Sequence, residues 1–598
     1  MDRNTLIRWA IISVLAVGLW KWGPTLFGRK HEGSTQQIPV ETYVNAPGFV
    51  GDAFQTEAKP GEPVPAPPEG ELCTIRGKRF EAELSSRGAA LTHFWLTDPQ
   101  YADGAKGLDI STTPDHERWR SLRTLFRGDG ANDQLQFDRF PWTLTKLPLD
   151  SGCAFHYADA DVAIDKIVRA GERPFELTVD TTIQNLSDAP KHHRFTIATY
   201  AFRTNEQTKG KMGRQSAFVT DLQCARDKDV TRKQKSDFKE GWFREPLDDR
   251  YAAVSNAYFA EALVPSVAYA PEKAGLVNDK PECALLAEAI APELGGDVEA
   301  DQAGAVYHAD LEYPPLVLAP KQSATYEVTA FFGPKERDVL ADAAGKTPRL
   351  GDLINLGFFT YVARILVAAL VFFHTHFIAN WGVAIIALTV CLRIGLFPLS
   401  WKQIQTTIAM RRIKPELDQV NKRFADDAQA RQMAMMELYR KHGVNPLGGC
   451  LPQLVQLPIW WAMWATLQTA VEMYHEKFLW LTDLSAPDKY FILPLVYGVF
   501  IVLQQRIVPQ QGMDPMQQKM MTYMMPGLFT MLVLFLPAAL GLYMLTSSAL
   551  GIVQQLAVEK IAPRNPPPSK GEIVVKQVAG DGGAGSKTPA FGKGNARV

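Results

Sequence analysis

The chain has 598 residues, enough for more than one domain, and its 63 lysines and arginines almost balance its 64 aspartates and glutamates. This balance provides no bulk positive charge for binding nucleic acid, and no specific nucleic-acid partner is expected. No Cys-x-x-Cys or Cys/His spacing typical of zinc is present, so neither a metal nor another cofactor is expected.

Residues 1–22 predict an N-terminal transmembrane anchor. Arg3 and Arg8 precede and enter an apolar run that ends at Trp20 and Trp22, and aromatic residues of this kind are typical of a membrane surface. A cleaved signal peptide is the alternative, but no small-x-small cleavage site follows the run. An uncleaved signal anchor is therefore favoured.

Residues 23–70 predict a flexible linker, because they are polar and end in the proline-rich run PGEPVPAPPEG. Residues 71–345 contain short runs, such as FELTVDTTIQNL, in which apolar and polar residues alternate. Such alternation is typical of half-buried strands, so a large β-sandwich with one or two helices is expected. Its histidines have no nucleophile or metal-ligand spacing beside them, which favours a scaffold or binding surface over a catalytic domain.

Four cysteines lie in this β-rich region: Cys73, Cys153, Cys224 and Cys283. They could pair in an oxidising compartment. Their wide spacing leaves free thiols an equally good interpretation, and no disulfide is predicted.

Residues 346–378 predict an amphipathic helix that lies in the membrane interface and does not cross. The segment from Lys402 to Lys441 contains nine basic residues against five acidic ones, which places it in the cytoplasm. Arg3 and Arg8 place the N-terminus on the same side, so the β domain is outside. A crossing at 346–378 would contradict that arrangement.

Residues 379–560 predict a helical membrane core that begins with the apolar run Trp381–Pro398. This run has the length of a bilayer span and contains a single charge, Arg393. A buried arginine in a span is costly and usually faces a partner or a water-filled recess. The nearest acids lie at or beyond the ends of the apolar stretches: Glu472, Asp488, Asp514 and Glu559. A hydrated recess that receives polar or acidic groups of another molecule is therefore expected, with a snorkelling or helix-tying arginine as the alternative.

A cytoplasmic hairpin of two helices is predicted within 401–443. Asp426 and Asp427 can cap the second helix, and Gly443 can end it. An ordinary solvated hairpin is the alternative to a docking surface for cytosolic partners or emerging chains.

Three further apolar stretches complete the predicted core. The stretch at 446–470 carries Gln453, Gln456 and Trp460 on one helical face. The stretch at 490–504 returns inward, and the stretch at 520–558 is broken at Pro537 into two spans of about 17 and 20 residues, the first too short for the bilayer core. With the N-terminal anchor, these spans place both termini inside.

Methionines gather just before and at the start of the last of these stretches. Met516, Met520 and Met524 are candidate client contacts, because methionine adapts to many apolar shapes. Filling of the core is the alternative. The tail, 561–598, is rich in proline, glycine and lysine and predicts disorder. Its GDGGAGSKT run lacks the lysine position and the preceding strand of a phosphate loop, so no ATP chemistry is expected.

Four stretches resemble the YidC membrane-protein insertase family in its long form from double-membraned bacteria. They are FFGPK at 331–335, the Arg393 span ending in FPLS, VNPLGGCLPQLVQLPIW at 444–460 and DPMQQKMMTYMMP at 514–526. The resemblance implies an α+β membrane protein of the bacterial inner membrane. It would have a periplasmic β-supersandwich, a five-span helical core and a hydrophilic groove open to cytoplasm and lipid.

The resemblance also implies residue roles. Arg393 matches the groove arginine and Thr389 its neighbour one turn earlier, while Pro458 and Trp460 match the client-facing third span. The family's pair of tyrosines in the last span reads Tyr543-Met544 here, so the second aromatic ring is absent.

The implied function is insertion and folding of nascent inner-membrane proteins, alone or with the Sec translocon and its accessory subunits. The hairpin and tail are candidate contacts for the ribosome or the signal-recognition pathway. Two other classes are considered. A secondary transporter would show paired charges and internal repeats, and a membrane-anchored carbohydrate-binding protein or enzyme would need a His/Glu constellation in the β domain. Neither pattern is found.

Overall fold

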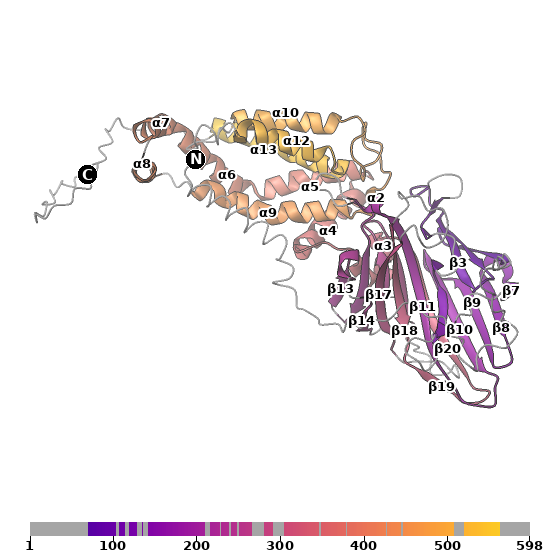
Figure 1. Ribbon diagram of the computed structural model, residues 1–598. Helices are drawn as coiled ribbons and strands as arrows, with labels where there is room; N and C mark the ends of the chain where they lie inside the picture. Colours follow the sequence, from indigo (N-terminus) through magenta and orange to yellow (C-terminus); the bar gives the residue numbers. More distant parts are fainter. Residues whose placement is uncertain are drawn as a thin grey trace, which may run out of the picture.

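A computed structural model describes residues 70–102, 107–113, 119–127, 134–135, 142–209, 216–227, 229–238, 241–247, 250–265, 280–290, 304–345, 349–377, 379–425, 427–443, 447–507 and 520–561. Figure 1 shows a β-rich domain beside a bundle of elongated helices, with α4 (Thr360–His376) between them. The predicted anchor at 1–22, the linker and the tail after residue 561 lie outside the described residues.

The β domain consists of two large sheets and one small sheet, and every described strand pairing is antiparallel. The nine-stranded sheet has the order β13 (Asp229–Lys233), β12 (Asp221–Arg226), β15 (Ala252–Ser255), β16 (Phe259–Pro265), β20 (Ser323–Pro334), β10 (Glu176–Asn185), β9 (Val162–Ala170), β8 (Gly152–Ala158) and β7 (Thr143–Lys146). The second large sheet has the order β14 (Phe243–Pro246), β17 (Glu282–Ile290), β18 (Gly304–Glu312), β11 (Lys191–Thr204), β5 (Arg123–Arg127) and β6 (Gln134–Leu135), with β19 (Leu316–Leu318) also paired to β11. The small sheet has the order β1 (Leu72–Gly77), β2 (Phe80–Ser85), β3 (Ala90–Leu96) and β4 (Leu108–Asp109).

The main core lies between these sheets and explains the alternation in the sequence. Along β10 buried residues alternate with half-buried ones, because successive side chains point to opposite faces of a strand. Phe195 of β11 stacks on Tyr326 of β20 with ring centroids 4.2 Å apart, which joins the two large sheets. The short helices of the domain are α2 (Asn205–Thr208) and α3 (Arg337–Asp342). The prediction of a large β-rich domain is confirmed.

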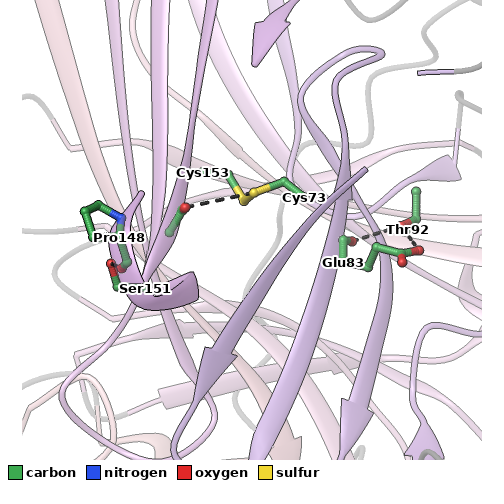
Figure 2. Close-up of a disulfide and its surroundings, with 7 residues drawn as sticks. Cys73, Glu83, Thr92, Pro148, Ser151 and Cys153 are labelled. Carbon is green, nitrogen blue, oxygen red and sulfur yellow. Dashed lines mark hydrogen bonds between the residues drawn. A yellow bond between two sulfur atoms is a disulfide. The ribbon is translucent and has the colours of Figure 1, made fainter. Parts of the chain in front are cut away.

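Two disulfides cross-link the β domain, which decides between the paired cysteines and the free thiols that the sequence left open. Cys73 of β1 pairs with Cys153 of β8, as Figure 2 shows, and Cys224 of β12 pairs with Cys283 of β17. The partners are 80 and 59 residues apart in sequence. The wide spacing in sequence did not indicate the pairing, because the fold brings β1 into contact with β8 and β12 into contact with β17.

A buried glutamate predicts a pH dependence of stability. Glu261 of β16 accepts hydrogen bonds from the hydroxyls of Thr199 (2.6 Å) and Ser121 (3.2 Å), and burial raises its pKa to about 7. Between about pH 4.5 and 7 the unfolded chain loses this proton while the folded chain keeps it. The free energy of unfolding should therefore fall as pH rises, by up to about 1.4 kcal/mol per pH unit from this group.

Glu261→Gln should remove this slope, so the variant should gain stability over the wild type as pH increases through that range. Thermal unfolding of the full chain at several pH values measures the difference. Glu71 is exposed, so Glu71→Gln serves as the control. It should leave the pH dependence of stability unchanged. A Glu261→Gln difference that stays constant from pH 4.5 to 8 would contradict the prediction.

The helical domain contains α4 and the helices that follow it. These are α5 (Trp381–Gly395), α6 (Phe397–Arg412), α7 (Lys414–Arg423), α8 (Ala428–Lys441), α9 (Leu447–Gln468), α10 (Ile492–Ile507), α12 (Met525–Val533) and α13 (Ala538–Ile561). A π-helical turn, Met520–Met524, precedes α12, and short 3-10 turns lie at Leu350–Leu353 and Val471–Met473.

The apolar run Trp381–Pro398 is not one straight helix, which corrects the prediction. The helix α5 ends at Gly395, and the chain bends by 65° into α6, whose first turn contains Pro398. Arg393 therefore lies in the last turn of α5, just before the bend. At 1.5 Å per residue the 15 residues of α5 extend only about 22 Å.

The basic segment forms a helical pair after α6. Leu417 of α7 and Leu438 of α8 are buried in one apolar cluster. Val420 of α7 and Ala434 of α8 are buried in a second cluster. The carboxylate of Asp427 accepts hydrogen bonds from the backbone N–H groups of residues 429 and 430, which confirms one of the two predicted caps. Asp426 lies outside the described residues. The prediction of two helices omitted α6, which fills most of the first part of the segment.

Among the described helices, α13 is long and apolar enough to cross a membrane alone, and α5 with α6 passes the same test as one bent span. The helices α4 and α10 and residues 522–533 are apolar but shorter. The predicted break at Pro537 is present, because α12 ends at Val533 and α13 begins at Ala538. The second helix is longer and the first shorter than expected.

The β domain contacts the segment between α9 and α10. The ring of Tyr474 lies against Tyr101, Tyr258 and Phe259, with centroids 5.7 to 5.9 Å apart. Glu472 accepts a hydrogen bond from Arg337 of α3 at 2.6 Å. We call this set of residues the Tyr474 contact. It joins the two domains through side chains far apart in the sequence.

Candidate functional site

Arg393 is the central residue of the candidate site. Its side chain is half-buried, and its Nη2 donates to both the carbonyl oxygen and the hydroxyl of Ser547 on α13, each at 2.7 Å. Its Nε is buried and has no hydrogen-bond partner among the described residues. The guanidinium is thus held at one end while part of its donor capacity is unused.

No ion pair neutralises Arg393 within the part of the chain that the structure describes. Glu472 pairs with Arg337, and Glu559 pairs with Arg411 at 2.9 Å. Asp488 accepts hydrogen bonds from the indole of Trp480 and the backbone N–H of Leu493. Asp514 lies outside the described residues. The three described acids that the sequence placed nearest therefore serve other partners.

Residues of α13 contact both the side chain and the backbone of Arg393. The side-chain amide of Gln554 donates to the carbonyl oxygen of Arg393 at 3.1 Å. Tyr543 and Met544 lie on the same helix, which packs against α5, and both are buried. The hydrogen bonds to Arg393 come from Ser547 and Gln554, which were not among the predicted site residues.

Thr389 lies one turn before Arg393 and is 1 % exposed. Its hydroxyl donates to the carbonyl oxygen of Ile385 in the same helix at 2.6 Å. This bond uses its donor within α5. Thr389 contributes a polar atom close to the arginine in sequence without a hydrogen bond to it.

The predicted residues of α9 form a separate group. Trp460 lies with its ring 5.2 Å from that of Trp464 and packs against the core of the helical domain. Gln456 and Pro458 are half-buried, and the side chain of Gln453 lies outside what the structure describes. No hydrogen bond, ion pair or ring contact joins the described side chains of this group to Arg393.

The structure describes two of the three methionines predicted as client contacts. Met520 and Met524, at the π-helical turn before α12, are 46 % and 55 % exposed. Met516 lies outside the described residues. The exposure of the two described side chains argues against their being simple core filling.

A second arginine contact lies nearer the helix ends. Arg411 of α6 donates to the carbonyl oxygen of Ile507, at the end of α10, and pairs with Glu559 in the last turns of α13. Gln555 donates to the same carboxylate at 2.7 Å. Three helices are therefore joined there, at one end of the bundle that contains Arg393.

Comparison with known proteins identifies related chains over most of the length. Residues 72–369 match the family model "YidC periplasmic domain", and residues 372–565 match "60Kd inner membrane protein". A "Membrane protein insertase YidC" of Anaeromyxobacter dehalogenans is 32 % identical over 520 residues, covering 84 % of this chain and 87 % of that one. A protein of the same name from Nitratidesulfovibrio vulgaris is 30 % identical over 585 residues, covering 93 % and 99 %. The solved structure "Active YidC insertase crystal structure with the first transmembrane domain resolved" aligns over 82 % of this chain and 94 % of that one, with 18 % identity and a TM-score of 0.34.

Proposed function

Since this chain belongs to the YidC family of membrane-protein insertases, we propose that it receives its clients at the side of Arg393 between α5 and α13. It is a protein of the inner membrane with a periplasmic β domain, and it inserts membrane proteins. Neither a carbohydrate-binding protein nor a secondary transporter is favoured. Its relatives are named for insertion, not for a chemical reaction.

The observation that carries this proposal is that Arg393 has no carboxylate partner among the residues that the structure describes. A half-buried cation whose buried Nε makes no hydrogen bond to any of those residues attracts an anionic or strongly polar group. A client's outer tail brings such groups, and contact with the guanidinium lowers the cost of removing them from water. No covalent step is required.

The apolar part of the client needs a different surface. The exposed side chains of Met520 and Met524 supply an adaptable apolar surface, and the half-buried Pro458 and Trp460 on α9 supply a second one. Tyr543 and Met544 line the buried side of α13, and Met544 keeps that position apolar in place of a second ring. The short helix α5, about 22 Å long, favours local thinning of the bilayer and so a shorter crossing.

The arrangement in the membrane follows the same proposal. We place five spans in the core, with α4 in the outer interface, the anchor 1–22 as a further span and both termini in the cytoplasm. The exposed face of α4 supports this placement, because Tyr361 and Ile365 are 85 % and 70 % exposed while Leu366 and Leu370 are buried against the bundle. The basic pair α7 and α8 is then cytoplasmic and available to the ribosome or a targeting factor, and the Sec translocon is a further candidate partner.

Reconstitution tests the function directly. The purified full chain in lipid vesicles should insert a single-span client whose outer tail then becomes protected from added protease. Vesicles holding an equal mass of an unrelated membrane protein provide the control. Equal protection in both vesicle types would contradict insertion by this chain.

A further inference from the structure

Three residues of α13 lie on one helical face opposite Arg393. Ser547, Gly551 and Gln554 are spaced i, i+4 and i+7, and residues at this spacing lie one above the other on a helix. Two of them contact the arginine from the same direction. Ser547 accepts from its side chain, and Gln554 donates to its backbone.

Gly551 completes this face by leaving room. A Cβ atom at this position would lie 3.5 Å from Nη2 and 3.8 Å from Cζ of Arg393. Alanine would therefore touch the guanidinium without a clash, and a branched side chain would push against it. The absence of a side chain allows the guanidinium to lie flat against α13.

We infer that Ser547, Gly551 and Gln554 are positioning residues that hold the Arg393 guanidinium for its client, and we call them the arginine seat. The inference rests on the proposed function, because it gives the seat the role of presenting Arg393. Ser547 occupies Nη2, while Nε and Nη1 make no hydrogen bond with any described residue. The seat thus fixes a long, flexible side chain before binding and directs its unused donors to an incoming acceptor.

Gln554 adds control of the backbone. Arg393 lies two residues before Gly395, the last residue of α5, next to the 65° bend into α6. Backbone carbonyls at the end of a helix lack their usual partners, so a side-chain donor there stabilises the ending. The bond from Gln554 therefore fixes both the position of the arginine and the point at which the chain turns.

The test compares two clients that differ only in the charge of the outer tail, one with aspartates and one with asparagines in their place. Ser547→Ala should slow insertion of the acidic client about three- to tenfold, because one of two acceptors on Nη2 is lost. Gly551→Val should slow it at least as much. Ser547→Thr retains a hydroxyl and should insert the acidic client at close to the wild-type rate.

Two controls separate positioning from general damage. Ser548→Ala makes the same change at a neighbouring serine for which the structure shows no contact to Arg393, and it should leave both clients unaffected. In an Arg393→Ala background, Ser547→Ala should cause no further loss. A double-mutant cycle of thermal unfolding for positions 393 and 547 measures the contact itself.

The outcomes distinguish the seat from the proposed function. If Arg393→Ala slows the acidic client while Ser547→Ala and Gly551→Val do not, the seat is overturned and the role of Arg393 stands. Equal slowing of both clients by Ser547→Ala also overturns the seat, because it indicates structural damage. If Arg393→Ala has no effect on either client, the proposed role of Arg393 is overturned. The positioning role of the arginine seat is then overturned too, even if the double-mutant cycle shows an interaction between residues 393 and 547.

Discussion

Arg393→Ala is expected to slow insertion of a client with an acidic outer tail about a hundredfold, while a client with a neutral tail is slowed much less. The reason is that a charge-assisted hydrogen bond contributes roughly 1.5–3 kcal/mol, and its loss leaves the client's carboxylate without a partner as it leaves water. Insertion rates in cells depleted of the native protein, scored by protease accessibility of the client tail, measure the effect.

Arg393→Lys is the matched variant, because it keeps the charge but not the planar array of donors. It should restore most insertion of the acidic client. The contacts to Ser547 and Gln554 make a purely helix-tying role the competing interpretation. That interpretation predicts that the alanine variant unfolds at lower temperature and slows both clients alike. A folded alanine variant that inserts both clients normally would show that Arg393 is dispensable.

Loss of either disulfide should destabilise the periplasmic domain by about 4 kcal/mol, which is a large part of the stability of a typical domain. The cross-links close loops of 80 and 59 residues, and in the chain-entropy account longer loops give larger stabilisation. Paired replacements, Cys73→Ser with Cys153→Ser and Cys224→Ser with Cys283→Ser, avoid leaving a free buried thiol.

Thermal unfolding of the full chain with and without a reducing agent measures this effect. Reductant should lower the unfolding temperature of the wild type and should affect each paired variant less. Cys391 is free and exposed, so Cys391→Ser serves as a control that should behave as the wild type does. If reductant leaves the wild-type unfolding temperature unchanged, the cross-links contribute little to stability.

Local patterns predicted those features that neighbouring residues determine. Alternation along segments such as 176–185 predicted strands, because burial on one face of a sheet requires a period of two. Asp427 predicted a helix start, because its carboxylate can accept from the first free N–H groups of the helix. Pro537 predicted the break before α13 for the opposite reason, since proline lacks an N–H group.

Features that depend on distant segments were predicted poorly. The pairing of Cys73 with Cys153 requires the sheet arrangement, which spacing in the sequence does not contain. The bend after Gly395 was missed because hydropathy continues unbroken through it. Arg393 itself was found, because a charge in an apolar run is visible locally. Its contact with Ser547 was not, because 154 residues separate the two.

The Tyr474 contact bears on how parts of this protein can be exchanged with those of relatives. Tyr474 lies in the segment between α9 and α10, yet its ring rests on Tyr101, Tyr258 and Phe259 of the β domain. In a hybrid that takes its β domain from one species and its helices from another, the two sides of the Tyr474 contact would come from different proteins and would not have been selected to fit each other. Such a hybrid should work better when residues 471–489 are transplanted with the β domain than when they stay with the helices. At this boundary, the residues that must come from the same species are those that touch in the folded protein, not those that are neighbours in the sequence.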